Sequence, residues 1–241
     1  MKTDFIPIDY DYFDFNGRNF AIVIGRNSSG KRVCIIDSCD VYFWVILKDG
    51  LSDKKTKKLI EKIERIKLDV KGRQTKVEKV EVHDKNFLGK KVRALKVFAT
   101  NYKDMHDIAD KMGFDEIEKR RGYDLGFVTH YIMEKKLVPS SWYEITGELL
   151  NNSLEFGGID SGLDVDICIK AEKIEKIEDK GFSPRALAYD IETDEIKIGS
   201  GEILMVSLVS ENFRKVITWK HKKSLKLGEK IPVEYVKNEE E

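Results

Sequence analysis

The segment Ala186-Leu-Ala-Tyr-Asp-Ile-Glu-Thr193 determines how the C-terminal part of this chain is interpreted. Its residues are typical of a β-strand, in which successive side chains point to opposite faces. Asp190 and Glu192 therefore share one face with the small residue Ala188. Two carboxylates on one face can bind the same divalent cation, and the small side chain beside them leaves space for it. This strand is a candidate metal site.

The sequence after this strand gives the acidic pair a context. An isolated Asp-x-Glu is common and, by itself, indicates only a solvated strand face. Here two further strands, 202–210 and 214–220, follow after short turns, which predicts a three-stranded meander. An acidic pair on the first strand of such a meander resembles the beginning of ribonuclease-H-like nucleases, which use two-metal hydrolysis. After the meander we expect only a charged tail, 225–241.

The region before residue 140 predicts a mixed α+β domain. Ser52 is a good N-cap, and apolar residues at helical spacing after it predict a helix over 52–67. Strands are expected at 19–25, 32–37, 41–47, 76–82, 92–99 and 114–119, and further helices at 103–112 and 124–136. From residue 41 the order is β-α-β-β-α-β, which is the ferredoxin-like unit that RNA-recognition modules also use.

Residues 140–180 show less regular patterning. They contain an apparent loop at 151–164 and a charged stretch at 171–181. We therefore expect a domain boundary here, with one domain over 1–140 and the beginning of a second, incomplete domain over 141–241.

The segment 25–31 satisfies most of a phosphate-binding loop pattern, G-x-x-x-x-G-K-[ST], but fails in two respects. Arg32 stands where a Ser or Thr would hold magnesium, and the segment leads into a strand instead of a helix. Asn27 and Gly30 are ordinary turn residues, so we predict a β-hairpin here. A phosphate-loop NTPase ranks third among the functions considered.

The composition limits the cellular setting. The chain has 43 basic and 43 acidic side chains, so any attraction to nucleic acid must come from local basic patches. Charged residues make up 36%, more than the roughly 25% usual for soluble domains, as in the ion-pair-rich surfaces of hyperthermophile proteins. Neither a signal peptide nor an apolar run of about 18 residues is present. The scattered Cys34, Cys39 and Cys168 favour a reducing compartment, so we expect a cytoplasmic protein without membrane contact.

Several segments together resemble archaeal family B DNA polymerases. LAYDIET (187–193) resembles the first exonuclease motif of that family, and KVITWK (215–220) resembles the third strand of the same exonuclease domain. Upstream, NFLGKK (86–91) and YIMEKKLVP (131–139) resemble the archaeal N-terminal domain in order and spacing. The resemblance extends over nearly the whole chain and is weakest at 140–180.

This resemblance implies a DNA-directed DNA polymerase with a 3′–5′ proofreading exonuclease. Asp190 and Glu192 would be catalytic ligands of two magnesium or manganese ions. No Asp follows Asp194, so residues outside this chain would complete the site. We therefore expect a truncated piece, or one subunit of a split polymerase, that is inactive alone. The implied partners are a DNA primer–template and the remaining polymerase domains or second subunit, with a sliding clamp as a further candidate.

Archaeal members also have an N-terminal pocket that stalls the enzyme at template uracil. By motif spacing, Tyr12 matches the family's tyrosine. Val41 stands where the family usually has proline, Met105 where it has valine, and His130 where it has arginine. Three of these four positions differ, so we expect uracil sensing to be weakened or lost.

Basic clusters offer candidate contacts to the DNA backbone. Lys119, Arg120 and Arg121 end an expected strand and are candidates for phosphate contact, as are the lysines at 220–223, whereas those at 54–58 are expected to be solvated. The main alternative function is a stand-alone single-strand-binding module, which would stack bases on aromatic side chains of the sheet. Tyr42 and Trp44 share a face, but the second central strand offers only Phe98, which indicates a weak platform.

Overall fold

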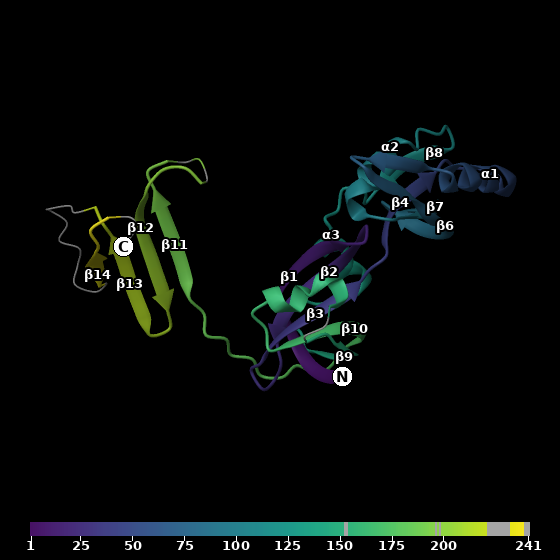
Figure 1. Ribbon diagram of the computed structural model, residues 1–241. Coiled ribbons are helices and arrows are strands. Elements are labelled where there is room, and N and C mark those ends of the chain that lie inside the picture. The colour runs from purple at the N-terminus through teal and green to yellow at the C-terminus, as the bar shows by residue number, and fades with distance from the viewer. Residues whose placement is uncertain (152–153, 196, 198, 221–231, 239–241) are drawn as a thin grey trace. The chain divides into compact units, whose positions relative to one another are not determined.

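The computed structural model describes residues 1–151, 154–195, 197, 199–220 and 232–238 (Figure 1). The chain forms two compact units, Met1–Lys180 and Gly181–Glu241. Strands predominate in both units, and the fold is of mixed α+β type, as expected. The first unit therefore extends beyond residue 140, where the sequence suggested a boundary.

The first unit contains a closed five-stranded barrel in the order β1-β2-β3-β10-β9. Its strands are β1 (Lys2–Phe15), β2 (Arg18–Arg26), β3 (Arg32–Ser38), β9 (Tyr143–Leu149) and β10 (Ile167–Lys176). β10 pairs in parallel with β3 and antiparallel with β9, and β9 pairs with β1 to close the barrel. The stretch 140–180, which has little regular pattern in the sequence, thus supplies two of the five barrel strands.

The turn between β2 and β3 is a hairpin, as predicted, and not a phosphate loop. The side chain of Asn27 accepts hydrogen bonds from the backbone N–H groups of Ser29 and Lys31. Arg26 and Arg32 are directly paired across the two strands. These hydrogen bonds satisfy backbone N–H groups of the turn with a side chain of the same turn. A β-strand lies on each side of it.

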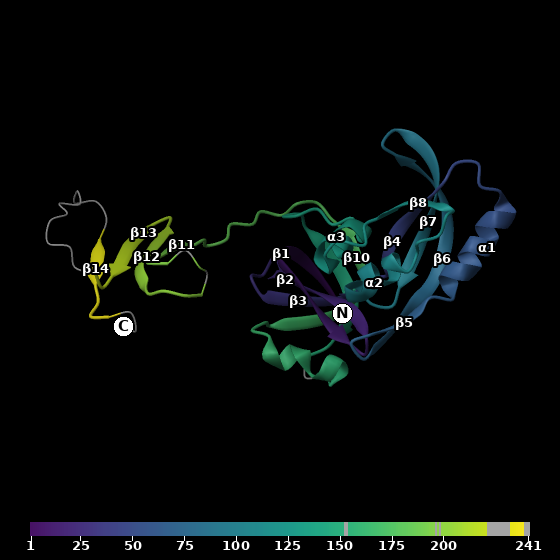
Figure 2. The ribbon, with the colours of Figure 1, turned by 90° about the horizontal axis from the view of Figure 1, so that it is seen from above.

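The other layer of the first unit is a five-stranded antiparallel sheet in the order β5-β6-β7-β4-β8. The strands are β4 (Val41–Leu47), β5 (Lys67–Val70), β6 (Arg73–Phe87), β7 (Lys90–Ala99) and β8 (Ile117–Arg121). Helix α1 (Asp53–Glu64) connects β4 to β5 and runs alongside β6 (Figure 2). The short elements η1 (Tyr102–Asp104) and α2 (Met105–Asp110) connect β7 to β8.

The helices are shorter than the sequence predicted. α1 begins after Ser52, whose hydroxyl accepts a hydrogen bond from Lys55 N, so the predicted N-cap is correct. The helix expected over 103–112 divides into η1 and α2. The last helix of this unit, α3, covers only Phe127–Glu134 within the expected range 124–136.

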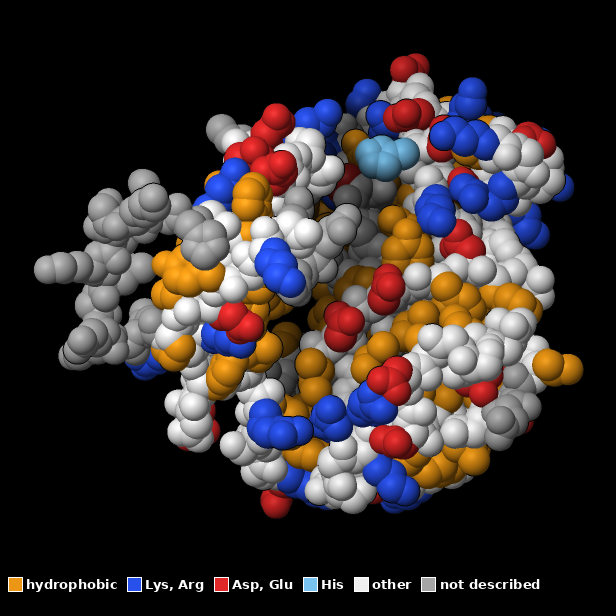
Figure 3. Space-filling model, turned by 60° about the vertical axis from the view of Figure 1, so that its left-hand side comes forward, with side chains coloured by type: hydrophobic (Ala, Val, Ile, Leu, Met, Phe, Trp, Pro, Cys, Tyr) orange, Lys and Arg blue, Asp and Glu red, His pale blue; other side chains and the backbone are white. Residues whose placement is uncertain are grey.

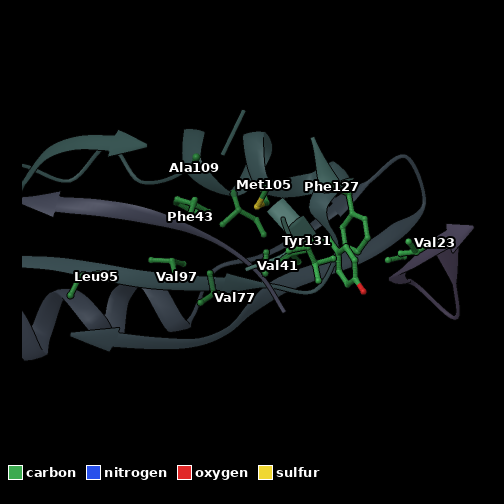
Figure 4. Close-up of a cluster of buried hydrophobic side chains, with 14 of the residues drawn as sticks. Val23, Val41, Phe43, Val77, Leu95, Val97, Met105, Ala109, Phe127 and Tyr131 are labelled. Atoms are coloured by element: carbon green, nitrogen blue, oxygen red, sulfur yellow. The ribbon is translucent and has the colours of Figure 1, made fainter. Parts of the chain in front are cut away.

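One continuous hydrophobic core joins the barrel, the sheet and the helices. Leu59 and Ile63 of α1, Leu95 of β7 and Ile108 of α2 are all completely buried. Figure 4 shows side chains from β4, β7, α2 and α3 in this cluster. Since alternate residues of β4 and β7 face this core, the opposite face of the sheet carries the intervening side chains.

A second apolar cluster covers the opposite side of the barrel strands. Phe156, the middle residue of η2 (Glu155–Gly157), which precedes η3 (Ile159–Gly162), packs against Phe13, Phe15 and Phe20 with ring centroids 4.8–5.7 Å apart. Its φ of 54° lies in the left-handed region, which costs a non-glycine residue free energy. The aromatic contacts offset that cost and fix the segment that the sequence predicted as a loop.

The second unit is a four-stranded sheet in the order β11-β12-β13-β14. β11 (Ala188–Thr193), β12 (Ile203–Ser210) and β13 (Phe213–Thr218) form the predicted antiparallel meander. The tail was expected to contain no further element, but β14 (Val233–Tyr235) pairs in parallel with β13. None of the described residues of this unit is buried, although β12 is almost entirely apolar.

Basic and acidic side chains are interspersed over the face of the molecule in Figure 3, with hydrophobic side chains between them. This mixture agrees with the zero net charge of the chain. Within the part of the chain that the structure describes, every helix is too short or too polar to cross a membrane.

Candidate functional site

The acidic pair lies on β11, one of the two edge strands of the described sheet in the second unit. Asp190 and Glu192 are two residues apart on a regular strand, so their side chains share a face, as predicted. The residues directly across on β12 are Ser207 and Met205, neither of which carries a charge. Both acidic residues are exposed.

The two carboxylates have no hydrogen bond or ion pair to any other described residue, whereas the neighbouring Asp194 is engaged. The Asp194 carboxylate accepts a hydrogen bond of 2.8 Å from Glu202 N, which closes the turn between β11 and β12. Asp194 is thus a turn residue, and Asp190 and Glu192 remain available to a cation.

The donor set fits part of a magnesium or manganese site. Carboxylate oxygens are the ligands these ions prefer, and two on one strand face can contribute to a single centre. Within the described residues, however, no group of three or more His, Cys, Asp or Glu side chains converges as a metal site would require. The pair can therefore supply a first set of ligands, and other groups must complete the coordination.

The four positions matched to the uracil pocket lie around the core of the first unit. Val41 and Met105 are buried in the same cluster as Phe127 and Tyr131 (Figure 4). The ring of Tyr12 packs against that cluster, 5.4 Å from the ring of Phe127. The Met105 side chain is completely buried, so it fills volume that a smaller residue would leave open.

His130 lies at the edge of the same region and acts as a buried neutral group. Its Nε2 is 3.0 Å from the carbonyl oxygen of Asp40, and only 4% of the residue is exposed. Burial lowers the pKa of His130 below its usual value of 6.5, because desolvation disfavours the charged ring. The ring is therefore neutral at pH 7 and does not replace a permanent cation.

The three basic residues of β8 do not act together. Lys119 and Arg121 point to the same side as Phe87, with their charged groups 5.6 and 5.8 Å from its ring centroid. Arg120 points to the opposite side, where its guanidinium donates to the carbonyl oxygen of Ala109 and lies 3.8 Å from Asp110. Lys119 and Arg121 are thus available to an external anion, while Arg120 supports α2. Of the other basic clusters, 221–223 lies outside the described residues.

One face of the sheet carries more aromatic and basic side chains than the sequence pattern indicates. That pattern points to Tyr42, Trp44 and Phe98, but not to Phe87 or to the lysines beside these rings. Alternate residues from Lys79 to Phe87 on β6 point to the same face as Tyr42 and Trp44. This period of two could have identified them, had β6 been predicted at its full length.

Comparisons with known proteins agree with these features. Residues 118–241, just over half of the chain, match the family model "DNA polymerase family B, exonuclease domain". The DNA polymerase of Thermococcus kodakarensis is 25% identical over 218 residues, covering 89% of this chain and 10% of that protein. The DNA polymerase of Desulfurococcus sp. (strain Tok) is 25% identical over 218 residues, covering 89% of this chain and 22% of that protein.

A solved structure shares the fold. It is the family B DNA polymerase from the hyperthermophilic archaeon Pyrobaculum calidifontis, with a TM-score of 0.62 and 20% sequence identity. The match covers 93% of this chain and 28% of that one, so the chain spans only a fraction of the relatives it resembles. Since the family model covers more than half of its residues, this chain belongs to the family B DNA polymerases.

Proposed function

We propose that this chain is the N-terminal part of a replicative DNA-directed DNA polymerase and contributes the first carboxylates of a 3′–5′ proofreading exonuclease. The observation that carries this proposal is the exposed, unpaired pair Asp190 and Glu192 on one face of β11, within the segment that matches the exonuclease family. The second unit would be the beginning of a ribonuclease-H-like domain.

Asp190 and Glu192 would hold magnesium or manganese against the phosphate at the 3′ end of a DNA strand. Once bound, these ions would activate the attacking water and stabilise the leaving oxygen. The role of β11 is to fix the spacing of the two carboxylates, because its pairing with β12 holds the backbone extended. The remaining ligands would come from residues outside this chain.

The exposed apolar surface of the second unit supports an incomplete domain. β12 contains six apolar residues in eight, yet all of its side chains are at least partly exposed. Apolar strands of this kind are normally covered by another layer. We propose that the remaining exonuclease segments, or a second subunit of a split polymerase, provide that layer.

The first unit would be the polymerase N-terminal domain, which guides the template strand. We place its end at the junction of the compact units, Lys180/Gly181, instead of at residue 140. The order and antiparallel pairing of β6, β7, β4 and β8, with α1 and α2 on one face, support a ferredoxin-like unit within it. A cytoplasmic location and a sliding clamp as partner complete the proposal.

The test replaces Asp190 and Glu192 by Ala in the full-length polymerase. Degradation of a mismatched primer end should be abolished, while extension of a matched primer stays near the parental rate, because polymerisation uses a separate metal site. Glu211→Ala is the matched control, since Glu211 is an exposed acid in the turn between β12 and β13. Parental exonuclease activity in the double variant would refute the proposal.

A second test uses the 241-residue chain by itself with a labelled primer–template, magnesium and nucleotides. We expect neither shortening nor extension, because two carboxylates on one strand cannot position both metal ions. Metal-dependent activity that survives repurification would show that the chain holds a complete site.

A further inference from the structure

The sheet of the first unit carries a row of aromatic rings on the face turned away from α1 and α2. Tyr42 and Trp44 of β4, Phe98 of β7 and Phe87 of β6 lie on this face. The ring of Tyr42 contacts those of Trp44 and Phe98, with centroids 5.8 and 5.6 Å apart. We call this surface the open face.

Cations accompany each of these rings. Lys96 lies 3.7 Å from the centroid of the Tyr42 ring, and Lys79 lies 4.0 Å from that of Phe98. Lys85 lies 4.8 Å from the Trp44 ring. Lys119 and Arg121 reach Phe87, as described above.

The open face has a local excess of positive charge. Three carboxylates approach these five cations: Glu81 is 3.0 Å from Lys79, Glu134 is 3.5 Å from Lys96, and Asp40 is 4.0 Å from Lys79. Lys85, Lys119 and Arg121 have no ion pair with another described residue. Because the whole chain has no net charge, this excess is a property of the surface and not of the composition.

A hollow of about 230 Å³ lies on the open face between Trp44 and Phe87. Apolar side chains, including Ile46 of β4, contribute to its lining together with Lys85, Asn86 and Arg121. Its volume is below the roughly 300–1,000 Å³ of pockets for drug-sized ligands, which suits one planar base. Aromatic walls flanked by cations provide stacking and phosphate contacts at once.

We propose that the open face binds a short single strand of nucleic acid, with one base in the hollow between Trp44 and Phe87. Stacking requires unpaired bases, so a duplex would not be accommodated. An ammonium group over an exposed ring is held more weakly than a stacked base, so a base can displace a lysine, which then contacts a phosphate. This site is separate from Asp190 and Glu192 and does not depend on the exonuclease assignment.

The accessible end of the row is the one around Trp44 and Phe87, because Phe98 is only 5% exposed and the Tyr42 hydroxyl donates a hydrogen bond of 2.8 Å to Glu134 of α3. Phe98 lies eight residues along β7 from Lys90, which pairs with Phe87. At about 3.3 Å per residue, the aromatic row is about 26 Å long. Lys85, Arg121 and Lys119 surround one end of the row, and Lys79 and Lys96 surround the other.

The test measures binding of fluorescein-labelled 12-nucleotide oligo(dT) and oligo(rU) to the 241-residue chain by fluorescence anisotropy at several salt concentrations. Trp44→Ala should weaken binding about five- to a hundredfold, whereas Trp44→Phe retains a stacking ring and should bind nearly as well as the parent. Lys85→Ala with Arg121→Ala should reduce the slope of log affinity against log salt by about 1.4, at about 0.7 per phosphate contact.

Lys54→Ala with Lys55→Ala is the matched control, because it removes two exposed charges from α1 on the other side of the sheet. Circular dichroism verifies that each variant is folded. Tighter binding of oligo(dT) or of oligo(rU) would identify the nucleic acid as DNA or RNA, and binding of either one supports the site. Binding of neither strand by the folded chain, or equal loss in the control and the open-face variants, would overturn the proposal. Failure of the exonuclease assignment would be seen separately, as parental degradation of a mismatched primer end by the full-length polymerase with both acids replaced.

Discussion

Replacing Arg73 by Ala should strongly destabilise the first unit, because it leaves a buried carboxylate without its partner. The Asp104 side chain is completely buried, whereas 34% of the Arg73 side chain is exposed. The guanidinium of Arg73 donates two hydrogen bonds to Asp104, one of them 2.9 Å long from Nε to Oδ2. Asp104 raises the pKa of Arg73, to which the nearby Asp14 and Asp107 also contribute. Without Arg73 the buried Asp104 carboxylate would lose both of these hydrogen bonds.

Breaking a buried ion pair costs about 3–5 kcal/mol, and water can reach the partly exposed position, so we expect about 3 kcal/mol. For a unit of this size that lowers Tm by about 6–12 °C. Adding Asp104→Asn to Arg73→Ala should recover about 1 kcal/mol, because a neutral amide is less costly to bury than a carboxylate.

The assay is urea unfolding followed by tryptophan fluorescence in a Trp219→Phe background, so that Trp44 and Trp142 report on the first unit alone. Arg73→Lys is the matched control, since it keeps the charge but loses the two-pronged geometry. A loss below about 1 kcal/mol for Arg73→Ala, or strictly additive effects in the double variant, would refute the reasoning.

Three further predictions concern the interior of the first unit. Cys34 and Cys168 face each other across β3 and β10, and their contact and burial raise the pKa of the Cys34 thiol. A thiol reagent at pH 8 should therefore leave both cysteines unmodified in the folded chain and label them in denaturant. Rapid labelling of the folded chain would contradict the packing. Burial lowers the pKa of His130, so the unfolded state takes up the proton at a higher pH than the folded state, and the free energy of unfolding should fall as the pH drops below about 6.5. Urea unfolding between pH 5 and 7 should show a smaller decrease in this free energy for His130→Gln than for the parent. Identical pH profiles for the two proteins would contradict this. In the full-length polymerase, the buried Met105 should permit copying through template uracil with little stalling; a strong pause in primer extension on a template containing uracil would show that the pocket still works.

Local features of the sequence were sufficient for several elements. Ser52 marks the start of α1 because an N-cap acts within one helical turn. The hairpin at Asn27 follows from side-chain bonds within five residues. Asp190 and Glu192 share a face because strand geometry has a period of two, whatever surrounds the strand.

Tertiary structure decided the features that depend on distant partners. The barrel closes because Ile167 pairs with Val33, and no local pattern indicates which strand edge will be free to accept β10. The sequence treated Lys119, Arg120 and Arg121 as one cluster, but pairing of β8 with β4 places Arg120 on the helix side and its neighbours on the open face. Local periodicity fixes which side chains share a face, whereas only the packing of the whole unit determines whether that face is buried, paired or left open to a ligand.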